Sequence, residues 1–383
     1  MKRGLYVHWP YCRRICPYCD FNVRRWRGDG EEEKTLLAAI LADIAGHGRQ
    51  VGRQSLHSVH FGGGTPSLLG PAAIAQILEA ADAAFGLEAG AEIGLEANPE
   101  DRMALGELAK AGINRFSLGI QAFDDGALAQ LGRGHASQEA LEAVDLAART
   151  GARVSLDLIH SRPGQNLQDW EQELRRALNL QIGHISLYQL TFEAGTPFFK
   201  ALAGKRIIAP DAEEAAEFLE LTQAVCAEAG FANYEISNYA RTPADRSLHN
   251  LLYWRGQEWI GVGPGAHGRI QKEGQRLATN AWRGLKPYIA EVAKRGLGWE
   301  SAQALSAQAQ GEELVLMGLR LHEGLELARA EGLLGFSLDC AALLQGGFAH
   351  HPEPGHLALT ASGRLIADRI ATELLLPPRR ARD

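Results

Sequence analysis

Short apolar segments recur along the first half of the chain, and each ends in glycine or in polar or charged residues. Segments of this length predict buried strands. Helical patterns lie between them; Leu36, Ile40 and Ile44, for example, share one stripe. The six predicted strands are Leu5–Trp9, Ser58–Phe61, Glu92–Ala97, Arg115–Gln121, Arg153–Ile159 and His184–Leu190.

Strands that alternate with helices predict an α/β protein with parallel pairing, right-handed crossovers and either a doubly wound sheet or a barrel. Six strand–helix units are fewer than the eight that close a TIM barrel, so we expect an incomplete (β/α)6 TIM-like barrel over residues 1–239. The periodic signal weakens over 240–299, which we interpret as a connecting segment. We expect residues 300–376 to form a small, mostly helical C-terminal domain with a short strand at His356–Leu359, and residues 377–383 to form a polar tail.

Composition limits the partners and the compartment. The 383 residues are 46% hydrophobic and carry a formal net charge of -7, which argues against a nucleic-acid partner because phosphate binding usually shows a basic excess. No apolar run approaches the roughly 20 residues of a membrane span, and the first residues lack the apolar run of a signal peptide. We therefore expect a cytoplasmic protein with no transmembrane segment. Cys226 and Cys340 are expected to be core residues.

Three cysteines near the N-terminus carry the strongest chemical signal. Cys12, Cys16 and Cys19 follow C-x3-C-x2-C spacing. Thiolates are the ligands of iron–sulfur clusters, and three of them leave one iron of a 4Fe-4S cluster open to a non-protein ligand. The alternatives are a zinc knuckle, which usually has a fourth Cys or His ligand nearby, and unrelated buried thiols.

Further candidate residues lie where the predicted strands end. The glycine-rich segment Gly62–Pro66 follows the second strand at the edge where α/β proteins bind ligands, and glycine allows close backbone approach. Glu96, Gln121 and Asp157 interrupt or end apolar strands, and Arg133 follows the fourth strand. A polar side chain in an apolar strand needs a partner, and a ligand at the mouth of the barrel would supply one.

The cysteine triad followed by the glycine-rich segment resembles the radical S-adenosylmethionine (radical SAM) superfamily, in which SAM completes the coordination of the open iron. The resemblance implies a partial barrel of the radical SAM type that binds a 4Fe-4S cluster and SAM. By carry-over, the cluster ligands are Cys12, Cys16 and Cys19. The residues implied to line the SAM site are Tyr6, Tyr18, Gly63, Gly64, Thr65, Glu96, Gln121, Arg133 and Asp157.

Longer segments resemble one branch of that superfamily, the oxygen-independent coproporphyrinogen III oxidases and the related heme chaperones of the HemW type. They include Tyr6–Cys12, His60–Pro66, Glu96–Pro99, Gly119–Phe123 and Tyr234–Ala240, and the likeness implies a HemN-like C-terminal domain. Two features favour the HemW branch. Phe21 stands where the oxidases have a further cysteine, and His249–Trp254 resembles the HNxxYW motif of the heme-binding branch. His249 and Tyr253 are the implied heme ligands, and a capping or core role is the alternative for His249.

The family usually has Asp-Leu-Ile-Tyr-Gly-Leu-Pro where this chain has Asp157-Leu-Ile-His-Ser-Arg-Pro163. His160 and Arg162 are therefore departures near the predicted cofactor site. His267, on a second glycine-rich segment (Gly261–Gly268), is a candidate for the substrate or heme side of the opening, and His350, His351 and His356 are expected to be solvated.

The leading hypothesis is a heme chaperone that passes heme to an acceptor protein. The alternative is an enzyme, oxygen-independent coproporphyrinogen III dehydrogenase, which would act on a porphyrin precursor. Radical SAM modification of RNA is a third hypothesis, for which the chain offers no basic groove or appended RNA-binding module.

Overall fold

A curved sheet of twelve strands forms the larger part of the protein, in a computed structural model that describes residues 2–376. The predicted tail over 377–383 lies outside the described residues. The strands, in spatial order, are β14 (Trp299–Ala304), β13 (Gln275–Ala281), β12 (His267–Lys272), β11 (Glu258–Val262), β1 (Arg3–Trp9), β4 (Leu56–Gly63), β5 (Leu87–Ala97), β6 (Arg115–Gln121), β7 (Arg153–His160), β8 (His184–Gln189), β10 (Asn238–Ala240) and β9 (Ala232–Asn233).

The six predicted strands are six consecutive strands of this sheet, β1, β4, β5, β6, β7 and β8, and they pair with one another in parallel. The predicted incomplete barrel is therefore confirmed. Apolar side chains of these strands form the larger hydrophobic core; Leu5, Val59 and Phe116, for example, are fully buried. The parallel arrangement brings the carboxyl ends of all six strands to one edge.

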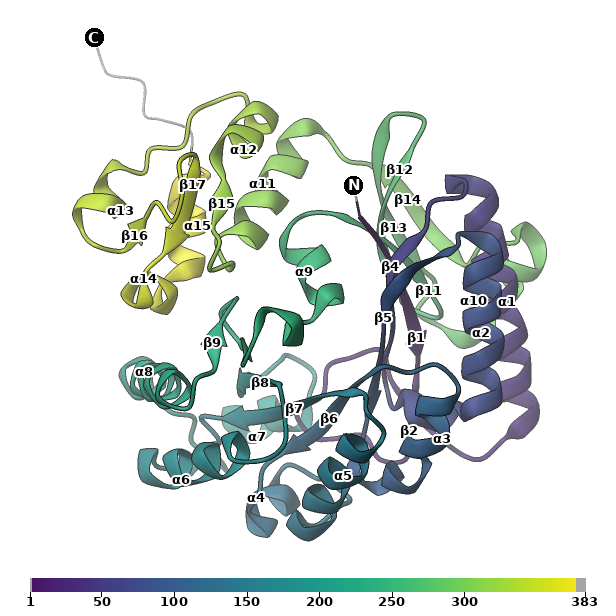
Figure 1. The fold of residues 1–383 in the computed structure, drawn as a ribbon, viewed down its shortest axis with the longest axis horizontal. Coiled ribbons are helices and arrows are strands. Elements are labelled where there is room, and N and C mark those ends of the chain that lie inside the picture. Colours follow the sequence, from purple (N-terminus) through teal and green to yellow (C-terminus); the bar gives the residue numbers. More distant parts are fainter. Residues whose placement is uncertain (1, 377–383) are drawn as a thin grey trace.

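Helices cover the convex side of the sheet, and the chain returns along them between strands (Figure 1). The long helix α1 buries Leu36, Ile40 and Ile44, the stripe that the sequence pattern predicts. The helices of this part are α1 (Gly30–Val51), α2 (Pro71–Ala84), α3 (Leu105–Lys110), α4 (Asp125–Gln130), α5 (Ser137–Arg149), α6 (Leu167–Leu178), α7 (Pro197–Ala203), α8 (Ala212–Glu228) and α10 (Leu285–Arg295), with short 3-10 turns at Pro66–Leu69, Pro99–Ala104 and Pro243–Asp245.

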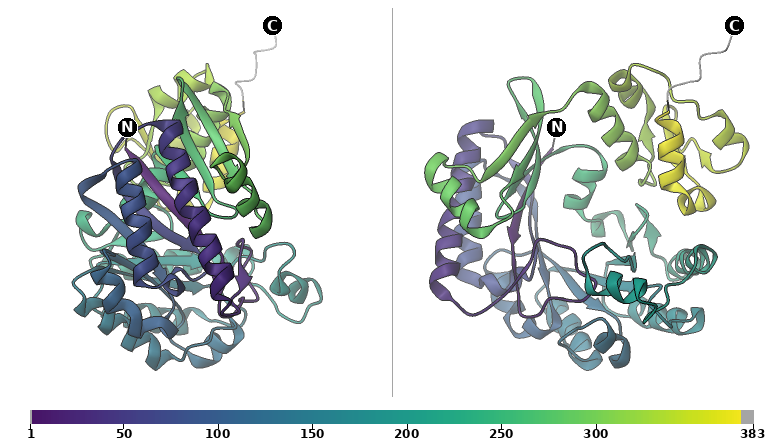
Figure 2. Two further views of the ribbon diagram at one scale, coloured as in Figure 1. Left: turned by 90° about the vertical axis from the view of Figure 1, so that its right-hand side faces the viewer. Right: turned by 180° about the vertical axis from the view of Figure 1, so that it is seen from behind.

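Residues 240–299, expected as a connection, contribute to the sheet. β11 pairs in parallel with β1, and β12 and β13 continue the sheet by antiparallel pairing. The short helix α9 (Leu248–Trp254) packs against β1, β4 and β5, inside the curve of the sheet (Figures 1 and 2). The weak periodicity of this segment reflects short strands that turn sharply at glycines.

The C-terminal unit has its own hydrophobic core, centred on Val315, Leu325 and Leu357. It lies beside α9 and away from the long outer helices (Figure 2). The predicted strand His356–Leu359 is β17, and Cys340 is buried in this core as expected, as Cys226 is in the larger one. Its elements are α11 (Ala307–Gly318), β15 (Leu325–Glu326), α12 (Leu327–Leu334), α13 (Ala341–Gln345), β16 (Ala349–His350), β17 (His356–Leu359), α14 (Ala361–Leu365) and α15 (Ala367–Leu374).

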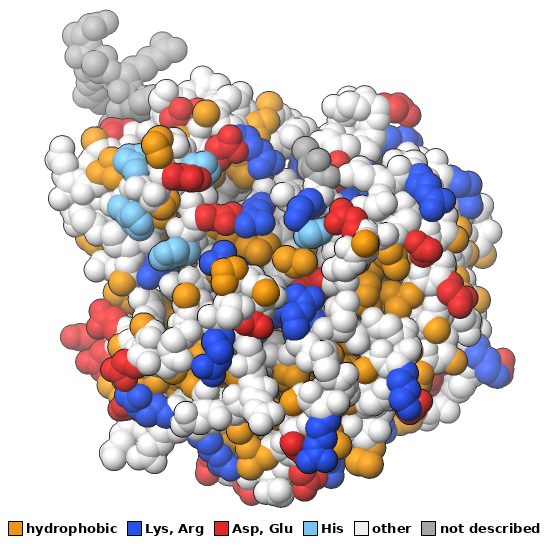
Figure 3. Space-filling view, viewed as in Figure 1, with side chains coloured by type: hydrophobic (Ala, Val, Ile, Leu, Met, Phe, Trp, Pro, Cys, Tyr) orange, Lys and Arg blue, Asp and Glu red, His pale blue; other side chains and the backbone are white. Residues whose placement is uncertain are grey.

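Acidic and basic side chains are interspersed on the face shown in Figure 3, and histidines gather over the C-terminal unit. His350 and His351 are exposed and His356 is half-buried. Within residues 2–376, no helix is both long and apolar enough to cross a lipid bilayer.

Candidate functional site

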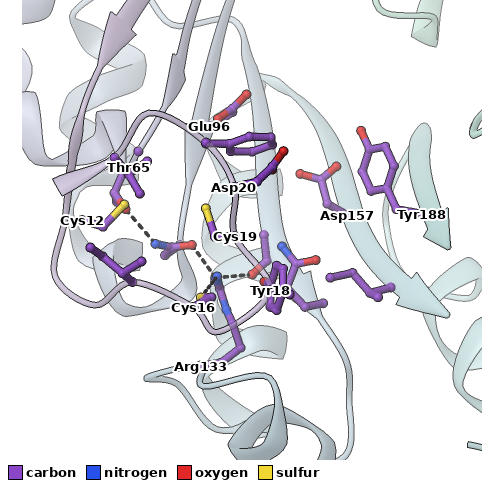
Figure 4. A pocket seen from close by; sticks show the side chains of 18 of the residues that line it. Cys12, Cys16, Tyr18, Cys19, Asp20, Thr65, Glu96, Arg133, Asp157 and Tyr188 are labelled. Carbon is purple, nitrogen blue, oxygen red and sulfur yellow. Dashed lines mark hydrogen bonds between the residues drawn. The ribbon is translucent and has the colours of Figure 1, made fainter. Parts of the chain in front are cut away.

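The carboxyl ends of the parallel strands surround a cavity of about 450 Å³, which we call the cysteine cavity. Strands β4 to β8 supply its floor, and the loop between β1 and α1 forms one wall (Figure 4). Among the residues predicted from sequence, those that line it are Cys12, Cys16, Tyr18, Cys19, Gly63, Gly64, Thr65, Glu96, Gln121, Arg133 and Asp157.

The three predicted cluster ligands lie on the loop between β1 and α1, where the short strands β2 (Tyr11–Cys12) and β3 (Arg24–Arg25) pair in parallel. Their side chains are half-buried around one end of the cavity (Figure 4). Within the described residues, no three His, Cys, Asp or Glu side chains converge to hold a single metal ion. In a 4Fe-4S cluster each cysteine binds a different iron, so the ligands need only surround a shared space. The donor set fits such a cluster: three thiols on one cavity, with no fourth protein thiol lining it.

Burial favours the protonated form of two of these thiols, Cys12 and Cys19. It raises the pKa of Cys12 to about 11, against an opposing hydrogen bond with Thr65, and it also raises the pKa of Cys19. Metal ligation requires thiolates, so assembly of a cluster at this site would release protons.

Arg133 ties the cysteine loop to the strand ends. Its Nη1 donates to Cys16 Sγ (3.5 Å), and its Nη2 donates to Gly119 O (2.8 Å) and to Asn98 Oδ1. Asn98 Nδ2 in turn donates to Thr65 Oγ1 (3.0 Å). The buried Arg133 Nε has no partner among the described residues. The guanidinium therefore places a positive charge beside thiols that must become anionic to bind iron.

The glycine-rich segment Gly62–Pro66 lies so close to the backbone of Trp9 and Tyr11 that Gly64 has no room for a side chain. A Cβ atom on Gly64 would lie 2.6 Å from Tyr11 O and 2.8 Å from Trp9 O, both backbone atoms that cannot swing away. The backbone here is joined to the cysteine loop, because Gly64 N donates to Trp9 O and Thr65 N donates to Tyr11 O, each at 2.8 Å. Gly63 has a positive φ of 106°, which favours glycine.

Three polar side chains at strand ends line the cysteine cavity, and they differ in hydrogen bonding, backbone conformation and burial. Glu96 accepts a hydrogen bond from Gly63 N (3.2 Å). Gln121 ends β6 at a register shift with φ of 68°, a strained conformation for a residue with a side chain. Burial raises the pKa of Asp157 to about 6, although hydrogen bonds from Ser186 and Ser117 lower it.

Tyr6 does not line the cysteine cavity. It lines a neighbouring cavity of about 440 Å³, which we call the aromatic cavity. Phe21, Gly63 and Glu96 line both. The complete lining of the aromatic cavity is Tyr6, His8, Phe21, Asn22, Gly63, Glu96, Tyr253, Trp259, Gly265, His267 and Arg283.

His249 lies behind both cavities, only 1% exposed. Its Nδ1 is hydrogen-bonded to Ser58 Oγ (2.8 Å) and its Nε2 to Tyr253 Oη (2.7 Å), so both ring nitrogens are engaged. Its ring stacks on His60 with the centroids 4.9 Å apart. Tyr253 reaches the aromatic cavity, whereas His249 lines neither cavity. In this conformation an iron ligated by His249 would have to displace one of these hydrogen bonds.

The departures at His160 and Arg162 are accommodated by packing outside the cysteine cavity. His160 is 2% exposed and stacks on Phe218 with the ring centroids 6.1 Å apart, and Arg162 forms a buried ion pair with Glu173 (2.6 Å). Ser161, where the family pattern has glycine, adopts a positive φ of 57°. None of these three side chains lines the cavity.

Some lining residues were not singled out from the sequence. Ser117 donates hydrogen bonds to the Asp157 carboxylate (2.9 and 3.0 Å), and Tyr188 faces Asp157 from the end of β8. Asn98 belongs to a segment quoted for the resemblance, and its position after β5 could have identified it. Trp259 and Arg283 carry no motif that could have marked them.

Comparison with known proteins agrees with this geometry. The sequence model of the Radical SAM superfamily matches residues 6–177. The fold is shared with coproporphyrinogen III oxidase (HemN) from Escherichia coli, described as a radical SAM enzyme, with a TM-score of 0.80, 22% identity, and coverage of 98% of this chain and 90% of that one.

Two relatives narrow the family. The chain is 38% identical to the radical S-adenosyl methionine domain-containing protein 1, mitochondrial, of Danio rerio, over 98% of this chain and 87% of the relative. It is 36% identical to the heme chaperone HemW of Mycobacterium tuberculosis, over 97% of this chain and 94% of the relative. The chain belongs to the radical SAM superfamily, within the coproporphyrinogen III oxidase family and its HemW branch.

Proposed function

We propose that the protein is a heme chaperone: it binds heme, holds a 4Fe-4S cluster with SAM in the cysteine cavity, and delivers heme to an acceptor protein. The observation that carries the proposal is identity of 36% along nearly the whole chain with a protein named as a heme chaperone. Cys12, Cys16 and Cys19 would hold the cluster. When bound, the cluster and SAM supply one-electron chemistry.

The residues of the cavity have distinct parts in this proposal. Arg133 compensates the negative charge of the thiolates, and the Gly63–Thr65 backbone provides a close approach for the methionine end of SAM. Glu96 and Asp157 offer carboxyl groups to the polar groups of the ligand. Phe21, 65% exposed at the boundary of the two cavities, occupies the position at which the oxidases carry a further cysteine.

The alternative is coproporphyrinogen III dehydrogenase activity, which the fold shared with HemN leaves as a second candidate. Anaerobically reconstituted protein would be titrated with heme and followed by visible absorption, then mixed with an apo-hemoprotein to measure transfer. A parallel incubation with dithionite, SAM and coproporphyrinogen III would be analysed for deoxyadenosine and protoporphyrinogen. We expect stoichiometric heme binding, transfer, and no protoporphyrinogen. Absence of heme binding would reject the chaperone proposal, and protoporphyrinogen would establish the enzyme instead.

The proposed compartment is the cytoplasm, as expected from sequence. Because one relative is named as a mitochondrial protein, fractionation of cells that express the full-length chain is the direct measurement.

A further inference from the structure

The aromatic cavity is lined by several aromatic side chains that surround open space. Four aromatic side chains surround it, contributed by β1, the cysteine loop, α9 and β11: Tyr6, Phe21, Tyr253 and Trp259. Phe21 is 65% exposed, although large aromatic side chains are usually covered. A volume of about 440 Å³ lies within the range of roughly 300–1,000 Å³ that is usual for small-molecule sites.

Glycines hold the loops of this cavity in place. A Cβ atom on Gly265 would collide with Asn22 Nδ2 at 2.5 Å, and Gly265 has a φ of 81°. Asn22 Nδ2 donates to Pro264 O (2.8 Å) and to Arg283 O (3.0 Å). One amide side chain of the cysteine loop thus fixes the loop before β12 and the turn after β13. The second glycine-rich segment of the sequence analysis, which contains Gly265 and His267, therefore forms one wall of the aromatic cavity.

Two histidines line the aromatic cavity, and they differ in whether their ring nitrogens are free to bind a ligand. His8 is 5% exposed, and its nitrogens are engaged by Tyr6 Oη (3.0 Å) and Asn22 O (2.9 Å). His267 is exposed, and neither of its ring nitrogens is hydrogen-bonded to any other described residue. Burial and the nearby Arg269 and Arg283 lower the pKa of His267, which favours the neutral imidazole that binds metals.

Arg283 supplies a positive charge at the same rim. It is exposed, and no carboxylate of the described residues forms an ion pair with it. An unpaired guanidinium beside an aromatic cavity suits a planar ligand with a carboxylate edge. A neutral imidazole beside it suits a ligand that contains iron.

We propose that the aromatic cavity is the heme site, in which His267 binds the iron and Arg283 pairs with a propionate. This inference rests on the proposed chaperone function, and it assigns the iron ligand to the exposed His267 and a positioning role to the buried His249. His249 holds Tyr253, a wall of the cavity, through its hydrogen bond. Since Phe21, Gly63 and Glu96 line both cavities, bound heme lies beside the SAM site.

The test is heme titration of the full-length, anaerobically reconstituted protein, with the Soret band and the electron paramagnetic resonance spectrum as readouts. His267→Ala should lower heme affinity at least tenfold and alter the ligand-field spectrum, and added imidazole should restore the original spectrum. His267→Met should bind heme with the spectrum of a thioether ligand. Arg283→Ala should weaken binding severalfold, with partial recovery in Arg283→Lys. His350→Ala, an exposed histidine outside both cavities, is the matched control.

Each outcome decides the inference. If wild-type protein binds no heme, the chaperone function itself fails. If wild-type protein binds heme and His267→Ala keeps both the affinity and the spectrum, the heme site is elsewhere and this inference alone is overturned. A ligand field lost in His249→Gln and retained in His267→Ala would assign the iron to the buried histidine. Circular dichroism checks that each variant is folded.

Discussion

The two cavities share a wall, yet they are built from different kinds of sequence. The cysteine cavity is formed by residues at the ends of consecutive parallel strands, within short contiguous motifs. The aromatic cavity joins the first strands to α9, β11 and the turn after β13, more than 200 residues later in the chain. Motif spacing therefore identifies the first cavity, whereas only the folded chain assembles the second.

The largest expected effect is loss of the cluster when one of its three cysteine ligands is removed. Cys16→Ala should abolish the 4Fe-4S cluster, since two remaining thiols cannot hold it in place of three. The measurement is iron and labile sulfide in anaerobically prepared protein. Cys226→Ala, which removes a fully buried thiol that does not line the cavity, is the control and should keep its iron. Equal iron in the two variants would contradict the assignment of the cluster to the cysteine cavity.

The two histidines should differ sharply in their effect on stability. His249→Ala removes a buried ring and leaves the hydroxyls of Ser58 and Tyr253 without their partner, which should lower the free energy of unfolding by about 2–3 kcal/mol. His267→Ala should change it by less than about 0.5 kcal/mol, because the side chain is exposed. Denaturant unfolding checks both. Similar values for the two variants would remove the structural distinction between these histidines.

The glycine-rich segment offers a test of close approach in the cysteine cavity. Gly64→Ala should lower SAM affinity about tenfold, which is about 1.4 kcal/mol, because the new methyl group must displace backbone atoms. Gly106→Ala is the matched control: it lies in α3 with open space around it, and alanine favours helices. Calorimetric titration of reconstituted protein with SAM measures the difference. An unchanged affinity would show that the Gly63–Thr65 backbone is not the methionine contact.

A smaller effect is expected from the pH dependence of Asp157. Its pKa is about 6 in the folded protein and 3.8 when unperturbed, so the folded state binds more protons between about pH 4 and 6. Stability from this group therefore falls as the pH rises through that window. Asp157→Asn should be more stable than wild type at pH 7 by about 1–2 kcal/mol, and the advantage should vanish near pH 4.

Urea unfolding at the two pH values measures this advantage. The exposed Asp145→Asn serves as control and should shift stability by less than about 0.5 kcal/mol at either pH. A constant difference between Asp157→Asn and wild type across the window would show that the carboxyl is not desolvated by the cavity.

Much of the fold follows from local patterns. The six parallel strands, the buried stripe of α1 and the strand His356–Leu359 were predicted from apolar periodicity, because the side chains that face the next layer of a fold are apolar. The strands of residues 240–299 were harder to predict. They are short and interrupted by glycines such as Gly261, whose Cβ would collide with the backbone of His267.

The sequence alone determined which residues are candidates for cluster ligands and which strand ends are candidates for a ligand site, because thiol spacing and strand order fix these within one stretch of chain. The tertiary structure decided which side chains remain available. His249 stands in the conspicuous motif, but Ser58 and Tyr253 occupy both of its nitrogens, and His267 faces a cavity with its ring unengaged. Whether a histidine nitrogen is free to bind a ligand depends on hydrogen-bond partners from distant segments of the chain. A local sequence pattern contains no information about those partners.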